Sequence, residues 1–584
     1  MTDSFDLVIR NGLIVDGSGG AAYQGDVAVT DGRIAQVGTV AGRGHEEIDA
    51  AGRVVTPGFV DIHTHYDGQV TWEHTLSPSS NHGVTTVVTG NCGVGFAPVR
   101  PGDHETLIKV MEGVEDIPEL VMAEGIPWNW ETFPEYMEAL AARPFDIDVA
   151  VQVPHSPIRV YVMGERGARH DASTAEDRTQ MTAIVSEAIR AGAIGVSTSR
   201  SSGHRLKNGE LAPSVTTEQD ELLALAQGLR EVGAGVFQLI TDASADPAEE
   251  LEVVTSIARA AQRPTSYTLL QAPRWPDKWR TMLALTEQAN AEGLELRGQV
   301  FPRPVGVLMG LDLSLHRFAY RPSYRAVADL PLAERVERLR DPAVKAAILS
   351  EQPIDDPQPL NNMMVNAIDE MFELTDPVDY APRRENSLVE RAKAAGRDPD
   401  EYIYDVLLKD EGRNIVYLPG ANFVGCSLDA AREMMDSDYT VLGLGDGGAH
   451  YGFICDASFP TFALTHWVRD AAPGQGFPLE RMVAELTSRP ARAVRLGDRG
   501  LIAPGMRADL NVIDMDALTL YAPRTVHDLP AGGRRLRQDA KGYVATVVAG
   551  EITYRDGAAT GTLPGRLVRG EGWHAPVPES ALPA

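Results

Sequence analysis

The sequence predicts an α/β protein in which eight parallel strands close into a (β/α)8 TIM-like barrel, with a composite β-sandwich from both termini and a long insertion. Two patterns carry this prediction: apolar β-rich runs alternate with helical segments through the middle of the chain, and hairpin-rich segments occur at both ends. At 584 residues the chain exceeds what one hydrophobic core organises, so a large domain with a smaller attached domain is expected.

The N-terminal segment reads as short alternating strands joined by turns. FDLVIRNGLIVDG, GDVAVTDGRIAQVG and HEEIDAAGRVVTPG contain Asn-Gly and Asp-Gly pairs, which are strong hairpin signals. The same pattern of short alternating strands and turns occurs in GMRADLNVIDMDAL and GYVATVVAGEITYRDG. We therefore expect residues 1–56 and 497–584, the latter with a C-terminal tail, to build one β-sandwich.

The barrel strands are predicted from apolar runs that end in small or polar residues. They are GFVDIHTH, TTVVTGNCG, DVAVQVPHS, AIGVSTSRS, AGVFQLI, PTSYTLL, LELRGQVFP and TVLGLGDGG. Several follow a helix that ends in glycine, as at Gly192 in SEAIRAGAIGVSTS. The first seven strands define a barrel region at 57–305, and the eighth strand with its helix lies at 438–496.

The long stretch between the seventh and eighth strands, residues 306–437, predicts an insertion. It is mostly helical, with segments such as LAERVERLR and SLVERAKAAGRDPDEYIYDVLLKD. Two interpretations stay open: a lid or wall over the barrel mouth, or a structural embellishment.

The net charge of the chain argues against some classes of binding partner. The formal charge is −29, from 82 acidic and 53 basic residues without a basic cluster, which argues against nucleic acid and anionic membranes. MTDSFDLVIRNG lacks a signal-peptide pattern, and no apolar stretch approaches the ~20 residues that span a bilayer. We expect a cytoplasmic protein with a small-molecule partner. Its cysteines, Cys92, Cys426 and Cys455, give no disulfide framework.

The segment TPGFVDIHTHYDG carries the clearest chemistry. His63 and His65 are two residues apart at the end of an apolar strand, so both imidazoles lie on one face. At the carboxyl end of a barrel strand this pair would face the usual site of a TIM barrel. The pattern therefore indicates two nitrogen ligands for a metal ion.

Two further strand ends carry candidate ligands. Cys92 follows the second strand in TTVVTGNCGVG; alone it would be read as a buried inert cysteine, but beside the histidine pair a metal thiolate is favoured. Asp446 follows the eighth strand in VLGLGDGGAHYG, where Asp-Gly is most often only a turn. A carboxylate there could hold the attacking water and pass its proton to the leaving nitrogen. His450 lies close enough to contribute.

These motifs carry a family resemblance. VVTPGFVDIHTH, the glycine-flanked Cys92, Asp446 and DRGLIAPGMRADLNVID resemble the N-acyl-D-amino-acid deacylases, the D-aminoacylase branch of the amidohydrolase superfamily. The resemblance implies a TIM barrel with a composite β-sandwich, zinc, and hydrolysis of a linear amide. It makes His63 and His65 the first-strand ligands, Cys92 the thiolate ligand and Asp446 the base.

Two departures from the family concern metal ligands. Gln238 in VFQLITD stands where the family has a histidine after the fifth strand, and Leu269, Leu270 and Gln271 stand where it has a His-His-Lys stretch. The remaining donors, His63, His65, Cys92 and Asp446, predict one Zn2+ per chain and make a second site doubtful. Because a working site needs a coordination position for water, either Asp446 binds the metal only loosely or the metal takes more than four ligands.

The second departure also affects substrate recognition, because Gln271 replaces the lysine that would meet a carboxylate. Arginine could take over that contact through its two-pronged hydrogen bonding. The candidates are Arg303 in QVFPRPVG and Arg200 or Arg205 in STSRSSGHRLKNG. The other residues expected to line the substrate pocket are His155, His204, Gln238, Gln271 and His450.

The leading functional hypothesis is a metal-dependent hydrolase that removes the acyl group from N-acyl-D-amino acids or related N-acyl compounds. The metal would lower the pKa of a bound water toward ~7, and Asp446 would move the proton. One alternative is a zinc amidohydrolase acting on an uncharged or cyclic amide or a carbamate. The other is a degenerate barrel that binds a ligand without catalysis.

Overall fold

Eight parallel strands form the barrel in the computed structural model, which describes residues 4–573. Each predicted run contains one strand, and neighbouring strands in the sheet pair in parallel. The strands are β6 (Phe59–Asp61), β7 (Val84–Thr89), β8 (Asp148–Pro154), β9 (Gly195–Ser199), β10 (Val236–Ile240), β11 (Thr265–Thr268), β12 (Leu296–Val300) and β16 (Thr440–Leu442). A parallel bridge between Thr64 and Gly447 links the last strand to the first. The predicted TIM-like barrel is confirmed.

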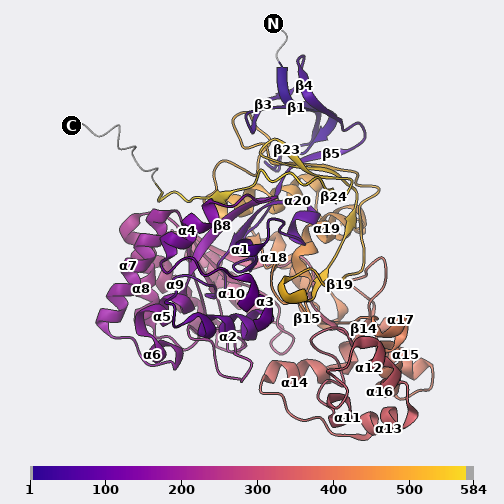
Figure 1. Ribbon diagram of the computed structural model, residues 1–584. Helices are drawn as coiled ribbons and strands as arrows, with labels where there is room; N and C mark the ends of the chain where they lie inside the picture. The colour runs from indigo at the N-terminus through magenta and orange to yellow at the C-terminus, as the bar shows by residue number, and fades with distance from the viewer. Residues whose placement is uncertain (1–3, 574–584) are drawn as a thin grey trace.

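Helices pack around the outside of this barrel (Figure 1). Local signals explain their ends: Thr174 and Asp177 form a capping box at the start of α7 (Ala175–Ala191), and Gly192 ends it at φ 107°. The other barrel helices are α5 (His155–Met163), α6 (Glu165–Ala168), α8 (Gln219–Val232), α9 (Pro247–Ala261), α10 (Lys278–Ala291), α18 (Asp429–Asp436), α19 (Phe459–Leu464), α20 (Leu479–Leu486) and α21 (Ser488–Ala493).

A second sheet joins the two ends of the chain, as the fold prediction required. Strand β5 (Val54–Pro57) pairs antiparallel with β17 (Leu510–Ile513), and the sheet encloses its own core, including Leu7, Val27 and Val547. Figure 1 shows the indigo and yellow strands together above the barrel. The remaining strands are β1 (Ser4–Ile14), β2 (Tyr23–Thr30), β3 (Arg33–Gly38), β4 (Arg43–Asp49), β22 (Tyr543–Val548), β23 (Glu551–Arg555) and β24 (Ala558–Ala559).

The C-terminal region also returns to the barrel. Strand β25 (Leu567–Val568) pairs in parallel with β8. Two short hairpins lie between the sheet strands: β18 (Thr519–Leu520) with β21 (Ala540–Lys541), and β19 (Arg524–Val526) with β20 (Arg535–Arg537). Residues 1–3 and 574–584 of the expected terminal regions lie outside the described residues.

The insertion between β12 and β16 has a core of its own, which includes Leu315, Phe318 and Ile403. Beside its helices it contains a three-stranded antiparallel sheet that the helical sequence pattern did not predict: β13 (Val305–Met309), β15 (Val416–Ala421) and β14 (Phe372–Glu373). The helices, at the lower right of Figure 1, are α11 (Pro322–Arg325), α12 (Leu332–Leu339), α13 (Pro342–Ser350), α14 (Pro359–Asn366), α15 (Leu388–Ala394), α16 (Pro399–Leu407) and α17 (Lys409–Gly412). Helix α18 packs on β12 and β16, so the barrel resumes before the expected boundary at residue 438.

A smaller excursion separates β7 from β8. It carries α2 (His104–Glu115), α3 (Glu119–Gly125) and α4 (Phe133–Ala141), while α1 (Gln69–Trp72) follows the first strand. Across residues 4–573, none of the helices combines the length and the apolar character that crossing a membrane requires.

Candidate metal centre

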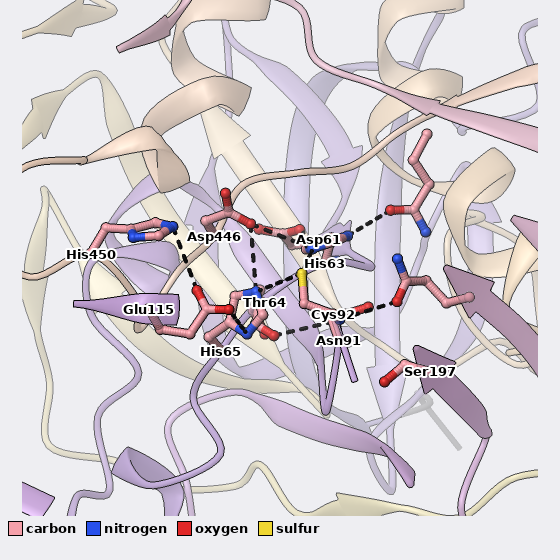
Figure 2. Close-up of polar contacts among 12 residues, drawn as sticks. Asp61, His63, Thr64, His65, Asn91, Cys92, Glu115, Ser197, Asp446 and His450 are labelled. Carbon is pink, nitrogen blue, oxygen red and sulfur yellow. Dashed lines mark hydrogen bonds and ion pairs between the residues drawn. The ribbon is translucent and has the colours of Figure 1, made fainter. Parts of the chain in front are cut away.

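The two histidines of the first strand lie just beyond β6, at the carboxyl end of the barrel. Both side chains are 1% exposed, and their ligand nitrogens lie with the sulfur of Cys92 within 4.8 Å of one another. Figure 2 shows these three side chains converging with Asp446. The structure therefore brings together the four residues that the sequence suggested as metal ligands.

Cys92 and Asp446 are both held in the left-handed backbone region, at φ 56° and 47°. Such conformations cost energy for residues other than glycine and concentrate at functional sites. The flanking glycines let other chain segments approach: a Cβ on Gly93 would lie 2.9 Å from the Cα of Thr198, and one on Gly448 would lie 2.9 Å from the carbonyl carbon of His65. Close packing at these turns explains the glycine-rich motifs.

The separations of the donor atoms fit a shared metal ion. The sulfur of Cys92 lies 3.3 Å from Nε2 of His63 and 3.5 Å from Nε2 of His65. Oδ1 of Asp446 lies 3.6 and 3.8 Å from the same two nitrogens. Ligands of a tetrahedral zinc ion are about 3.4–3.6 Å apart, given the usual zinc–ligand bond lengths. Two nitrogens, one sulfur and one oxygen thus surround a position suited to zinc.

The electrostatics of the cluster favour a cation. Burial lowers the pKa of His63 to about 4 and holds that of His65 well below its usual value, which keeps both imidazoles in the neutral form that binds metals. Burial also raises the pKa of the Cys92 thiol, and it raises the pKa of Asp446 to about 7. Within residues 4–573 no lysine or arginine pairs with Asp446. A divalent ion would supply the positive charge that both groups need to act as anionic ligands.

Side chains on other barrel strands support the candidate ligands. Nδ1 of His63 lies 2.7 Å from Oε1 of Gln299 on β12, whose amide nitrogen donates to Ser266 at 2.9 Å. The backbone N–H of Cys92 donates to Oε1 of Gln238 at 3.2 Å. Gln238, which stands in place of a family histidine, thus supports the turn that carries the thiol.

The residues after the sixth strand do not add ligands. Leu269 is 2% exposed and belongs to the hydrophobic core. The side chain of Gln271 accepts a hydrogen bond from the backbone of Val424 at 3.3 Å, so it holds the end of the insertion. Neither residue restores a second metal site or a cationic contact.

Four residues expected in the substrate pocket have internal partners instead. His155 lies 2.8 Å from both Glu221 and Thr198, in a buried cluster with Arg159. Carboxylates or carbonyls hold the three arginines. Glu250 pairs with Arg200 at 2.8 Å, the carbonyls of Ser202 and Gly209 accept from Arg205, and Asp456 pairs with Arg303 at 2.6 Å. Sequence position alone did not reveal these pairings.

Arg303 is fully buried, whereas Arg200 and Arg205 are only partly buried. Its guanidinium stacks over Tyr380, 3.7 Å from the ring centre. Nη2 binds Asp456, whereas Nε and Nη1 have no hydrogen-bond partner among the described residues. The arginine therefore keeps polar hydrogens free, but Asp456 already compensates its charge.

His204 and His450 do lie near the candidate ligands. The charges of His63 and His204 lower the pKa of His450, after the larger effect of burial, to about 3. Nδ1 of each of these two histidines is buried and lacks a hydrogen-bond partner in the described part of the chain. Like Arg303, and like Gln238 through its Nε2, they are expected pocket residues that keep a polar atom available for a ligand.

Glu115 is the residue of this site that the sequence did not reveal. It ends α2 and is 2% exposed, with its two oxygens 3.5 Å from Nδ1 of His65 and 3.5 Å from Nε2 of His450. Its segment, VMEGVEDIP, reads as an ordinary helix end and carries no ligand spacing.

Comparisons with known proteins agree with this geometry. The profile of the Amidohydrolase family matches residues 46–554. A D-aminoacylase from Alcaligenes xylosoxydans xylosoxydans is 26% identical over 579 residues, covering 97% of each chain. An N-acyl-D-aspartate deacylase from the same organism is 36% identical over 235 residues, which are 40% of this chain and 42% of that protein.

Solved structures show the same fold. A D-aminoacylase structure matches with a TM-score of 0.64 and 24% identity, covering 97% of this chain and 100% of the other. An N-acyl-D-glutamate deacylase from Bordetella bronchiseptica, solved with zinc and a phosphonate inhibitor, matches with a TM-score of 0.62 and the same coverage.

Proposed function

This chain belongs to the amidohydrolase family, and we propose that it removes the acyl group from N-acyl-D-amino acids or related N-acyl compounds at a single metal ion. It is a hydrolase acting on carbon–nitrogen bonds other than peptide bonds, and its reaction is metal-dependent amide hydrolysis. The observation that carries the proposal is the convergence of His63, His65, Cys92 and Asp446 where the last barrel strand meets the first.

We assign the metal to these four residues and propose zinc, one ion per chain. When bound, such an ion polarises a substrate carbonyl and lowers the pKa of water toward ~7. A count of one rests on Gln238 and Leu269, which replace the histidines of a second site. The solved D-aminoacylase is described as having a binuclear centre with one-metal activation and second-metal attenuation, which agrees with a proposal of one activating ion here.

Asp446 is our candidate for the general base. Its side chain is 21% exposed, against 1% for each histidine, so it can meet water and substrate. Its backbone N–H donates to the carbonyl of His63, which fixes the carboxylate beside the imidazoles. In the proposed reaction the Asp446 carboxylate takes a proton from the attacking water and gives it to the leaving nitrogen.

The substrate is bound by polar groups around this base. We propose that His204 and His450 contact the amide or its substituents and that Arg303 faces a substrate carboxylate. The Arg303–Asp456 pair and the use of Gln271 in holding the insertion favour a second candidate, an uncharged or cyclic amide or a carbamate, since neither needs a free cation. The non-catalytic barrel is set aside, because family membership makes this chain a hydrolase.

The direct test is metal analysis combined with a screen of N-acyl-D-amino acids, their L-isomers and simple anilides. We expect chelator-sensitive hydrolysis of at least one N-acyl-D-amino acid and recovery when zinc is returned. If the zinc-loaded protein hydrolyses none of these amides, the proposal fails. If it hydrolyses only the uncharged substrates, the second candidate replaces the first.

A further inference from the structure

We propose that Glu115 is a positioning residue of the metal site, which orients His65 and His450 and is itself held in place by the insertion. This inference rests on the metal site proposed above. Glu115 comes from α2, in the excursion between β7 and β8, and not from a barrel strand end. Figure 2 shows its carboxylate between the two imidazoles.

Each oxygen of the carboxylate faces a different ring. Oε1 lies 3.5 Å from Nδ1 of His65, and Oε2 lies 3.5 Å from Nε2 of His450. The opposite nitrogen of His65, Nε2, faces Cys92 and Asp446. The carboxylate therefore lies behind the proposed ligand, on the side away from the metal position.

A carboxylate in that place determines which nitrogen of the imidazole carries the proton. A proton on Nδ1 of His65 directed at Glu115 leaves the lone pair on Nε2, which is the form that binds a metal through Nε2. Nδ1 of His65 has no hydrogen-bond partner among the described residues, and the Glu115 carboxylate, at 3.5 Å, lies next to it. His63 has a matching arrangement, since its Nδ1 lies 2.7 Å from the amide oxygen of Gln299. One imidazole thus faces a carboxamide and the other a carboxyl group.

The position of Glu115 is fixed from two directions. The backbone N–H of His450 donates to the carbonyl of Glu115. The next residue, Asp116, accepts hydrogen bonds from the backbone N–H of Gly452 at 3.2 Å and from the hydroxyl of Ser314 at 2.9 Å. Ser314 belongs to the insertion between β12 and β16, so the insertion contacts the helix end that carries the carboxylate.

The burial of Glu115 gives an independent reason for this role. Removing a carboxylate from water costs several kcal/mol unless a partner compensates. Within residues 4–573 the basic groups next to its carboxylate are the imidazoles of His65 and His450, and no lysine or arginine pairs with it. A cation bound by His65 would supply the missing charge through the imidazole. The buried carboxylate is therefore understood most simply as part of the cation site.

The test compares metal binding by the full-length protein with that of Glu115→Ala and Glu115→Gln. Zinc dissociation constants are measured by competition with a chelator, and the absorption spectrum of the cobalt(II)-substituted protein reports the ligand geometry. We expect Glu115→Ala to bind zinc roughly 10- to 100-fold more weakly, the range for partners that orient metal ligands. Glu115→Gln keeps an accepting oxygen, so its loss of affinity should be smaller. Both should lower kcat more than they raise KM.

Two variants complete the design. Glu105 lies on the same helix, and among the described residues its exposed carboxylate pairs only with Lys109, so Glu105→Gln should bind zinc like the parent. Ser314→Ala removes the contact between the insertion and Asp116, and should weaken zinc binding less than Glu115→Ala does.

Three results separate the possible failures. If folded Glu115→Ala and Glu115→Gln bind zinc as tightly as the parent and give its cobalt spectrum, the positioning role is refuted while the proposed hydrolase stands. If Glu105→Gln weakens binding as much as Glu115→Ala, the effect is one of overall charge and the inference also fails. If the parent protein binds no metal, the proposed function itself fails.

Discussion

The backbone N–H of Asp446 donates a hydrogen bond to the carbonyl oxygen of His63 across 3.0 Å, and the side chains of the same two residues lie 3.6 Å apart. The contact that links the eighth barrel strand to the first therefore also sets the proposed base beside a proposed metal ligand. Because the two tasks use the same residues, small changes in barrel closure should alter the metal site.

Metal content is the first test of the site. We expect near one tightly bound zinc ion per chain, because His63, His65 and Cys92 hold one position and Gln238 supplies no imidazole for another. Elemental analysis of the purified protein gives the count. Two tightly bound equivalents would contradict the single-ion proposal, and removal of the ion by a chelator should abolish hydrolysis.

Asp446→Asn tests the general base. The substitution keeps the size of the side chain and the backbone bond to His63, so the protein should fold. Its hydrolysis rate should fall by roughly 10^2- to 10^4-fold, the range for a lost proton-transfer group. Zinc content is measured in parallel, so that loss of metal is not mistaken for loss of the base. Activity within a few-fold of the parent would place the base elsewhere, with His450 the next candidate.

Gly93→Ala tests the turn that carries Cys92. Both Gly93 and Gly425 have positive φ, +69° and +70°, but only Gly93 has other chain within 4 Å of the added Cβ. The left-handed conformation alone should cost Gly425→Ala about 1–2 kcal/mol of unfolding free energy. Gly93→Ala should lose more, because its Cβ would lie 2.9 Å from the backbone of Thr198. Thermal unfolding temperatures compare the two variants. Equal decreases in unfolding temperature would show that the structure around Gly93 accommodates the added Cβ without further cost.

Arg303→Met tests how the substrate is held. On its own this variant leaves Asp456 buried without its partner, which should cost about 3–5 kcal/mol of stability. Adding Asp456→Asn removes that unpaired charge and should recover much of the unfolding temperature. The double variant is therefore the form to use in kinetics.

If a substrate carboxylate contacts Arg303 in the parent protein, the double variant should show the loss of that contact as a change in KM. For N-acyl-D-amino acids KM should rise strongly while kcat changes less, because the contact binds substrate and transition state alike. The matching neutral amides should be unaffected. Better hydrolysis of neutral amides by the parent, with both substrates unchanged in the variant, would support the uncharged-amide alternative.

The buried cluster of His155, Arg159 and Glu221 should make stability depend on acid pH. Burial alone would raise the pKa of Glu221, but the hydrogen bonds and charges of His155 and Arg159 lower it to about 2. Because the pKa of Glu221 in the folded protein lies below its usual value of 4.5, the stabilisation is present above pH 4.5 and is lost as pH falls toward 2. The shift corresponds to about 3 kcal/mol. Glu221→Gln should lower the unfolding temperature at pH 7 and flatten its decline in acid; an unchanged decline would contradict this linkage.

The sequence by itself determined the barrel and the residues at its strand ends. Buried parallel strands need continuous apolar runs, so all eight could be recognised without knowing their neighbours. Side chains that directly follow such strands meet at one face of a closed barrel. For that reason His63, His65, Cys92 and Asp446 could be placed together from local patterns alone.

The tertiary structure alone decided which charges are paired and which residues lie next to the proposed metal ligands. Asp456 compensates Arg303, and Glu221 holds His155, through contacts between segments with no periodic relation in the sequence. Glu115 reaches His65 and His450 because a helix outside the barrel packs over its mouth. Ion pairs and hydrogen bonds depend on distances of a few ångströms between parts of the chain far apart in sequence. Local periodicity fixes the direction of a side chain within its own strand or helix, but the partner that it meets depends on how the elements pack.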